Sequence, residues 1–258
     1  MTPHPIGFTR VDLGTGVDAG FTNRFGGVSS APWDSLNLGP NVSDVPDAVA
    51  ANRKLAALEL GAPIVFSSQV HGAHAIQVDD EIASAWLKPE PPVTVGEADA
   101  LLTTSHQVGL GVLVADCVPV LLAGEGVVAT AHAGRRGVEQ NVIGVIIGQM
   151  KAQGAKNIKA AIGPAICGRC YEVPDVMRAE VAELEPKAWA VTRQGTAGLD
   201  LPAAVADQLE RAGAEVAYRS DVCTLEHGDY FSHRRATQTA SPGTPAQTGR
   251  QAGLIRLT

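Results

Sequence analysis

Two short apolar runs joined by a glycine-rich link constrain the fold of this chain more than any other feature. Residues 118–123 and 127–131 consist largely of β-branched or small apolar side chains, and Gly124-Glu125-Gly126 joins them. Short runs of this kind around a link that contains glycine predict a β-hairpin. Each run also ends next to a reactive side chain: Cys117 precedes the first run, and His132 follows the second.

The hairpin register decides which of these side chains meet. If Gly124-Glu125 is a two-residue loop, Cys117 faces His132. The β-carbons of directly opposed residues in an antiparallel pair are about 4.5–5.5 Å apart, so the thiol and the imidazole can share a proton or a metal ion. A three-residue loop would shift the register by one residue and weaken this pairing. The alternative interpretation is two buried residues at strand ends, since free cysteine is commonly buried.

His71 is the third candidate in this set. Residues 63–80 predict two strands about a His71-Gly72 turn, which would present the imidazole at a strand end. His71, Cys117 and His132 with an open fourth position are typical of a catalytic zinc site. Sulfur and imidazole ligands favour zinc or copper over magnesium or calcium. His74 is a weaker candidate ligand, and His71 on its own is also compatible with a turn histidine that binds nearby backbone.

Asp116 precedes Cys117 directly and could orient a ligand or accept a proton. The alternative is a carboxylate at a strand end that is paired with an arginine.

Four arginines are candidates for binding an anion such as phosphate. Residues 132–141 predict a strand end that passes through Gly134 into a helix, and the free N–H groups of such a junction attract anions. Arg135 and Arg136 add charge and planar donors there. Arg235 and Arg250 flank residues 236–249, whose Ser/Thr/Pro/Gly composition predicts a mobile loop, and the two could close over an anionic substrate. The alternative is a set of solvated arginines at an ordinary helix start. His233 is a further candidate without an assigned role.

Cys167 and Cys170 form a CxxC pair. A structural zinc site needs four ligands, and the sequence has neither a second CxxC nor an HxxxH pair. The interpretation from sequence is therefore two small residues in a turn.

The rest of the chain mixes strands and helices. Helices are expected over residues 44–61, 137–154, 173–186 and 200–213, and strands are expected within 18–30 and 215–225. The first helix has Gly61 as its C-cap, and its predicted apolar face consists of Val45, Val49, Leu55, Leu58 and Leu60. This mixture indicates an α+β or α/β fold, and the absence of a linker composition predicts one domain over residues 1–258.

Bulk properties restrict the partners. A net charge of −7 over 258 residues argues against general binding of nucleic acid. No run approaches the roughly 18 apolar residues that a membrane span needs, and the start of the chain has no leader pattern, so a cytoplasmic protein is expected. The expected oligomeric state is a monomer or a weak homo-oligomer.

Several motifs occur in a specific order along nearly the whole chain. They are QVHG, EADALLTT, VADCVPVLL, AHAGRRG, AIGPAICGRCYEV, FSHRR and TGR. This series resembles the laccase-domain purine nucleoside phosphorylase family, formerly named multicopper polyphenol oxidase, which includes the peptidoglycan editing factors. The resemblance implies an α-β-β-α layered sandwich similar to the catalytic domain of the cytotoxic necrotizing factor deamidases.

The resemblance also implies a chemistry. The family's metal ligands correspond to His71, Cys117 and His132, and its activity implies zinc-dependent phosphorolysis of adenosine, inosine and methylthioadenosine together with adenosine deamination. Purine nucleoside and phosphate would be the partners. From the residues themselves, Cys117 and His132 are the candidate catalytic residues, with Asp116 as a proton carrier because a carboxylate near the metal suits general acid–base catalysis. The family motifs have tryptophan where this chain has Arg135 and tyrosine where it has His233. A different pocket lining is therefore expected.

Three other functions remain open from the sequence. Cys117 and His132 could act as nucleophile and base of a metal-free hydrolase or deamidase that edits peptidoglycan precursors. A copper-dependent polyphenol oxidase is suggested by the older family name, but it is disfavoured because the chain has only seven histidines, several at unrelated positions. A structural zinc or an interaction module is disfavoured by the lack of an obvious fourth ligand.

Overall fold

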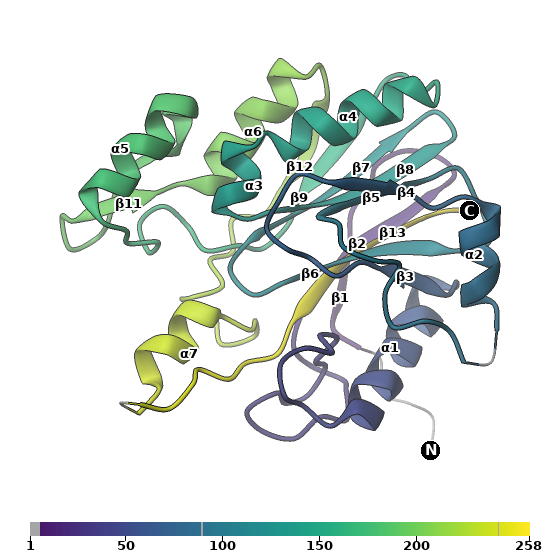
Figure 1. Cartoon of the computed structure of the whole chain (residues 1–258), viewed down its shortest axis with the longest axis horizontal. Helices are drawn as coiled ribbons and strands as arrows, with labels where there is room; N and C mark the ends of the chain where they lie inside the picture. The colour runs from purple at the N-terminus through teal and green to yellow at the C-terminus, as the bar shows by residue number, and fades with distance from the viewer. Residues whose placement is uncertain (1–5, 89, 242) are drawn as a thin grey trace.

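The computed structural model describes residues 6–88, 90–241 and 243–258, and two sheets dominate it (Figure 1). The five-stranded sheet has the order β1 (Phe8–Arg10), β2 (Val17–Thr22), β13 (Gln251–Leu257), β6 (Gly109–Val114) and β3 (Ile64–Phe66). The six-stranded sheet has the order β12 (Glu215–Arg219), β9 (Lys159–Ile162), β7 (Val118–Gly124), β8 (Val127–Ala133), β5 (Ala100–Thr103) and β4 (Ala75–Gln77). A short ribbon of β10 (Trp189–Val191) and β11 (Ala197–Leu199) lies apart from both.

Seven α-helices accompany these sheets in the described residues. They are α1 (Pro46–Leu60), α2 (Asp80–Trp86), α3 (Arg135–Glu139), α4 (Val142–Ala152), α5 (Asp175–Leu184), α6 (Leu201–Arg211) and α7 (His233–Thr239). In Figure 1, α3, α4 and α6 cover one side of the six-stranded sheet, and α1 lies below the five-stranded sheet. Within the described part of the chain, no helix is both long and apolar enough to span a membrane.

Three separate hydrophobic clusters show that the layers follow the order α-β-β-α. Strand β7 illustrates this, because its successive side chains point to opposite faces. Val120 and Leu122 pack with α3, α4 and α6 in one cluster, whereas Leu121 and Ala123 pack between the two sheets. The third cluster lies between α1 and the five-stranded sheet. A strand buried on both faces explains why the apolar runs are continuous rather than alternating. The mixed α+β class and the expected layers are thus confirmed.

The central hairpin forms, but the predicted register is wrong by two residues. Its loop is Glu125-Gly126, and Gly126 has a φ of 72°, which glycine adopts without strain. Pro119 therefore pairs with His132, and Cys117 lies just before β7. Because side chains alternate along a strand, a shift of two residues leaves them on the same face, whereas a shift of one would not.

Helix α1 confirms the predicted helix and its C-cap, with Gly61 at a φ of 78°. Its predicted apolar face is only partly correct, since Val45 and Leu58 are exposed. Asn52 is fully buried on this helix instead. Burial of this polar side chain is possible because its amide group donates to Ser29, Ser35 and Asn37 and its Oδ1 accepts from Val28 N–H.

Two further predictions need correction. The expected helix over 137–154 is divided into α3 and α4 at Asn141, which has a left-handed φ of 55° and caps α4 through its side chain. The expected loop over 236–249 begins inside α7, whose first turn is capped by the Ser232 hydroxyl. The helices expected over 173–186 and 200–213 are confirmed as α5 and α6.

Candidate active site

Two loops and the end of strand β8 bring His71, Cys117 and His132 together at one end of the six-stranded sheet. His132 is the penultimate residue of β8, Cys117 immediately precedes β7, and His71 lies in the loop that leads to β4. Their candidate ligand atoms all lie within 4.8 Å of one another. The two imidazole rings meet edge to face, with 4.7 Å between their centroids. The triad is therefore assembled as predicted, although Cys117 reaches His132 diagonally and not directly across the hairpin.

Two unusual backbone conformations present these side chains. His71 has a φ of 61°, and Asp116, the residue before Cys117, has a φ of 88°. Non-glycine residues rarely adopt this region, and each instance costs about 1–3 kcal/mol, so the surrounding contacts must hold it. His71 and Gly72 both donate their backbone N–H groups to the carboxylate of Asp99. That carboxylate therefore holds the His71 turn in place.

Asp99 is a candidate site residue that the sequence pattern did not single out. It is 2% exposed, and its Oδ1 lies 2.7 Å from Nδ1 of His132. This contact fixes the orientation of the ring and leaves Nε2 as the nitrogen available to a metal ion, as a carboxylate bonded to a metal-binding histidine does. The signal was present in the EADALLTT motif, where one carboxylate stands directly before the apolar residues of β5.

Electrostatics favour a charged pair at Cys117 and His132. Burial alone would raise the pKa of Cys117, but the neighbouring His132 and then His71 outweigh burial and lower it to about 6. Burial opposes protonation of His132 as well, yet Cys117 and Asp99 raise its pKa to about 9. Without a metal ion, the pair is thus a thiolate and an imidazolium at neutral pH. A thiolate is also the form of cysteine that binds metals.

The donor set fits a divalent transition metal. One thiolate and two imidazoles converge, and His71 is exposed, so a fourth position is open to the outside, as in catalytic zinc sites. Gly134 passes close behind the cluster. A Cβ atom at this position would lie 3.1 Å from Sγ of Cys117 and 3.0 Å from Cδ2 of His71. His74, the weaker candidate, is not part of this cluster.

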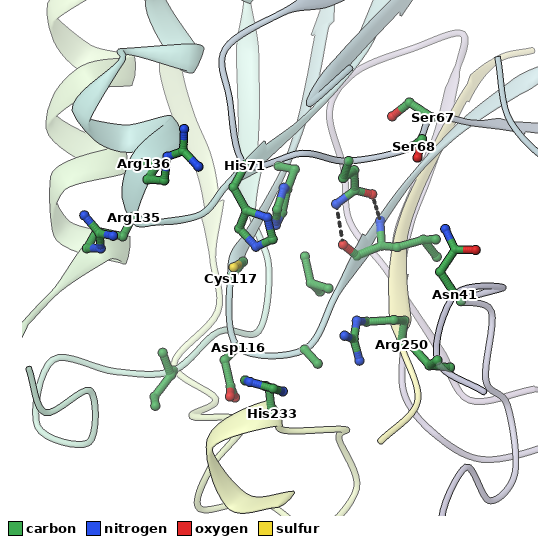
Figure 2. Close-up of a pocket in the computed structure, with 18 of the residues that line it drawn as sticks. Asn41, Ser67, Ser68, His71, Asp116, Cys117, Arg135, Arg136, His233 and Arg250 are labelled. Atoms are coloured by element: carbon green, nitrogen blue, oxygen red, sulfur yellow. Dashed lines mark hydrogen bonds between the residues drawn. The ribbon is translucent and has the colours of Figure 1, made fainter. Parts of the chain in front are cut away.

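The cluster opens into a cavity of about 640 Å³, a size typical of small-molecule sites. In Figure 2, Arg135 and Arg136 lie on one side of the triad, and Arg250 with Asn41, Ser67 and Ser68 lies on the other. Asp116 and His233 line the lower part of this view. The cavity therefore joins the candidate metal ligands to cationic and neutral polar side chains.

Three of the four predicted anion-binding arginines line this cavity. Arg135 also pairs with Glu139, and burial lowers the pKa of Arg250. Arg235 does not line it, because its guanidinium donates to four backbone carbonyls of residues 224–230. The neighbouring Arg234 lines the cavity instead.

Asp116 lines the cavity with both carboxylate oxygens engaged. They accept hydrogen bonds from the Thr224 hydroxyl and from the Arg234 backbone N–H, each at 2.6 Å. These contacts connect the segment before β7 to the start of α7 and to the loop after β12.

The fold and the site together describe a class of protein. It is an α-β-β-α sandwich that carries a candidate metal site of one cysteine and two histidines at the mouth of a polar cavity. Residues 18–258 match the family model described as multi-copper polyphenol oxidoreductase laccase. The chain belongs to this family, as the motif series predicted.

Relatives with assigned names cover nearly the whole chain. A purine nucleoside phosphorylase of Streptomyces coelicolor is 47% identical over 253 residues, which are 95% of this chain and 98% of the relative. The purine nucleoside phosphorylase YfiH of Escherichia coli is 35% identical over 249 residues, 94% of each chain. The crystal structure of YlmD from Geobacillus stearothermophilus superposes with a TM-score of 0.84 at 31% identity and covers 98% of this chain and 97% of that one.

Proposed function

We propose that this protein is a zinc-dependent purine nucleoside enzyme that cleaves adenosine, inosine and methylthioadenosine with phosphate and also deaminates adenosine. The observation that carries the proposal is the triad of His71, Cys117 and His132 at the mouth of a cavity that is large enough for a nucleoside. The full-length relatives that are named purine nucleoside phosphorylase support the same substrate class.

His71, Cys117 and His132 would hold the metal ion. Bound there, zinc supplies Lewis-acid stabilisation of negative charge that develops on the reacting groups. Asp99 holds His132 in one orientation and fixes the His71 turn, so the ligands are positioned before metal binds. Gly134 leaves the space that this close approach requires.

Phosphate would bind to the arginines of the cavity. In phosphorolysis, a phosphate oxygen forms a bond to C1′ of the ribose while the bond from C1′ to the purine nitrogen breaks. Arg135 and Arg136 lie next to the triad and Arg250 lies across the cavity, so the three can neutralise the anion and orient it. Arg235 instead holds the loop after β12 in place through its carbonyl contacts.

Asp116 is proposed to serve the proton transfers of both reactions. In deamination, the oxygen of water replaces the C6 amino group of adenosine, and ammonia leaves with an added proton. Asp116 lies beside Cys117 and lines the cavity, which gives its carboxylate access to a bound substrate. Its hydrogen bonds from Thr224 and Arg234 hold it in one orientation.

A metal-free cysteine hydrolase or deamidase acting on peptidoglycan precursors is the second candidate. The lowered pKa of Cys117 next to His132 favours it, because the same pair could act as nucleophile and base. The expected likeness to the cytotoxic necrotizing factor catalytic domain belongs to this candidate and stays a prediction. Copper at the same ligands remains compatible with the soft donor set.

The test measures metal content and products on one preparation. We expect near-stoichiometric zinc, phosphate-dependent formation of adenine and ribose 1-phosphate from adenosine, and phosphate-independent formation of inosine. Cys117→Ala and His71→Ala should lose the zinc ion held by the triad and should form none of these products. A metal-free protein that leaves adenosine unchanged would contradict the proposal and favour the cysteine hydrolase.

Three broader expectations also stay proposals. They are a single domain over residues 1–258, a cytoplasmic location, and a monomer or weak homo-oligomer. The first is supported by the stacking of the helices, both sheets and α1 in successive layers, with one hydrophobic cluster between each pair of layers.

A further inference from the structure

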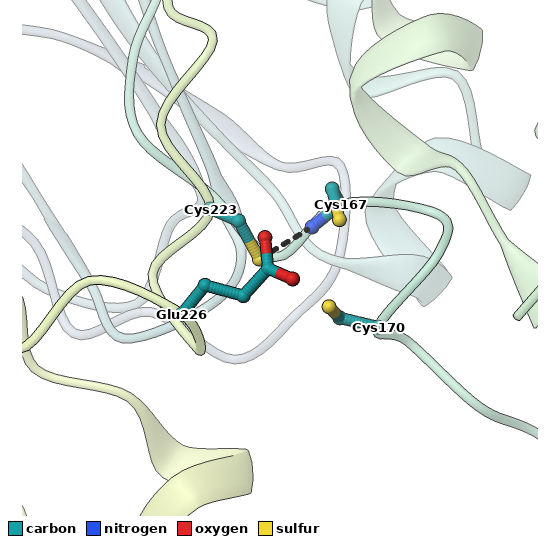
Figure 3. A group of neighbouring side chains, drawn as sticks. All are labelled: Cys167, Cys170, Cys223 and Glu226. Atoms are coloured by element: carbon teal, nitrogen blue, oxygen red, sulfur yellow. Dashed lines mark hydrogen bonds between the residues drawn. The ribbon is translucent and has the colours of Figure 1, made fainter. Parts of the chain in front are cut away.

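A second group of metal-ligating side chains lies outside the triad (Figure 3). Cys167 and Cys170 lie in the loop between β9 and α5, and Cys223 and Glu226 lie in the loop after β12. Their three sulfur atoms and one carboxylate oxygen all lie within 4.8 Å of one another. The CxxC pair is expected from sequence to be a turn because the chain has no second CxxC or HxxxH pair; its partners are single residues more than fifty positions further along the chain.

Backbone hydrogen bonds hold the four residues in this arrangement. The N–H groups of Cys170 and Tyr171 donate to the carbonyl of Cys167, which closes the CxxC turn. The N–H of Glu226 donates to the carbonyl of Cys223 in a similar turn. The two loops are joined by a β-bridge between Ala165 and Cys223.

The same framework places a donor on one of the sulfurs. The N–H of Cys167 lies 3.4 Å from Sγ of Cys223. An N–H that points at a sulfur stabilises the thiolate, which is the form of cysteine that binds metals.

We propose that Cys167, Cys170, Cys223 and Glu226 bind a structural zinc ion that is separate from the triad. Three thiolates and one carboxylate form a soft, four-ligand set, and zinc accepts both kinds of ligand in tetrahedral sites. A closed set of four ligands is typical of structural sites, whereas the triad leaves one position open. This inference does not depend on the proposed enzymatic function.

Arg193 pairs with the Glu226 carboxylate. Its guanidinium lies 2.5 Å from the carboxylate, and the arginine side chain is 48% exposed. It can therefore move into solvent when a cation takes the carboxylate.

The second site would stabilise the walls of the first cavity. Ile166, next to Cys167, donates its N–H to the carbonyl of Asp116, and Tyr171, next to Cys170, lines the cavity. Thr224, next to Cys223, donates its hydroxyl to the Asp116 carboxylate. A metal ion that joins the two loops would thus hold Ile166, Tyr171 and Thr224 in place, and with them the contacts to Asp116 and one wall of the cavity.

Counting zinc in a set of variants tests the inference. The protein is purified under reducing conditions, loaded with zinc, desalted and weighed by native mass spectrometry. We expect two zinc ions in the wild type, one in His71→Ala, one in Cys170→Ser and none in the double variant. Arg193→Ala is the matched control and should keep two. Equal zinc content in the wild type and in Cys170→Ser would overturn the inference.

A second measurement needs no change at the proposed site. In His71→Ala/Cys117→Ala, the three remaining cysteines are those of the second site. We expect one equivalent of zinc to protect all three from iodoacetamide, and a chelator to abolish this protection, as read by peptide mass mapping. Equal alkylation with and without zinc, or a Cys167–Cys170 disulfide in the reduced preparation, would overturn the inference. If His71→Ala keeps the wild-type zinc count while Cys170→Ser loses one ion, the second site stands and the triad is not the metal centre.

Discussion

Asp99 and His132 are joined by a buried contact of 2.7 Å between Oδ1 and Nδ1, and the same carboxylate accepts the N–H groups of His71 and Gly72. One side chain thus orients one candidate ligand through its ring and a second through its backbone. Two of the three candidate ligands therefore depend on a residue that does not itself belong to the triad. Asp99 is a positioning residue in this arrangement.

Asp99→Asn should weaken zinc binding at the triad by about 10–100-fold, which is the usual effect of losing the hydrogen-bond partner of a metal-binding histidine. The amide retains the shape of the side chain but loses the charge that favours a single ring orientation. Competition with a chromophoric chelator measures the affinity. Asp175→Asn, an exposed carboxylate on α5, serves as the control and should not change it. Equal affinities for Asp99→Asn and the wild type would remove Asp99 from the metal site.

Gly134→Ala should lower both zinc affinity and turnover, because the new methyl group would lie 3.0–3.1 Å from His71 and Cys117. These neighbours must move by a few tenths of an ångström, which disturbs ligand geometry. Gly148→Ala in α4 is the matched control, since no described atom lies within 4 Å of its Cβ. The control should gain up to about 1 kcal/mol of stability from helix propensity and retain activity. Full zinc affinity in Gly134→Ala would show that the space behind the triad is not needed.

Alkylation of Cys117 in the metal-free protein should have a midpoint near pH 6. The pKa is lowered, so the reactive thiolate is present above that pH and is lost as the pH falls through it. The rate is followed with iodoacetamide and peptide mapping. In His132→Ala the midpoint should rise, because the neighbouring positive charge is gone while burial still opposes the thiolate. A midpoint that does not respond to His132→Ala would contradict the charged pair.

Arg136→Ala and Arg235→Ala should differ in kind. Arg136 lines the cavity, so its loss should raise KM for phosphate by about tenfold or more, which corresponds to one charge-assisted hydrogen bond. Arg235 donates to backbone carbonyls, so its loss should instead lower the free energy of unfolding by about 1–3 kcal/mol. Steady-state kinetics and urea unfolding separate the two effects. The opposite pattern would reverse the assignment of the two arginines.

The sequence predicted those features that depend on local pattern. The hairpin, helices α5 and α6 and the Gly61 cap follow from periodicity and glycine chemistry. The register was missed by two residues because Gly124 and Gly126 offer two possible two-residue loops, and the sheet neighbours of β7 and β8 decide between them.

Features that depend on tertiary contacts were harder to predict. Asp99 was missed because its role follows from pairing of β5 with β8, which brings it beside His132. Arg235 was expected at the cavity because it flanks residues 236–249 in the sequence, but its position in the sequence does not determine where the guanidinium points. The partners of the CxxC pair could not be predicted from the sequence either, because Cys223 approaches Cys167 and Cys170 only through the pairing of the two loops.

Zinc titration of the chelated protein tests the central claim most directly. Adenine release from adenosine and phosphate is measured as a function of zinc bound at the triad, with His71→Ala as the control. The account predicts that activity returns in proportion to occupancy of the triad and that His71→Ala stays inactive when loaded with zinc. Full activity in the chelated protein, or in zinc-loaded His71→Ala, would contradict it.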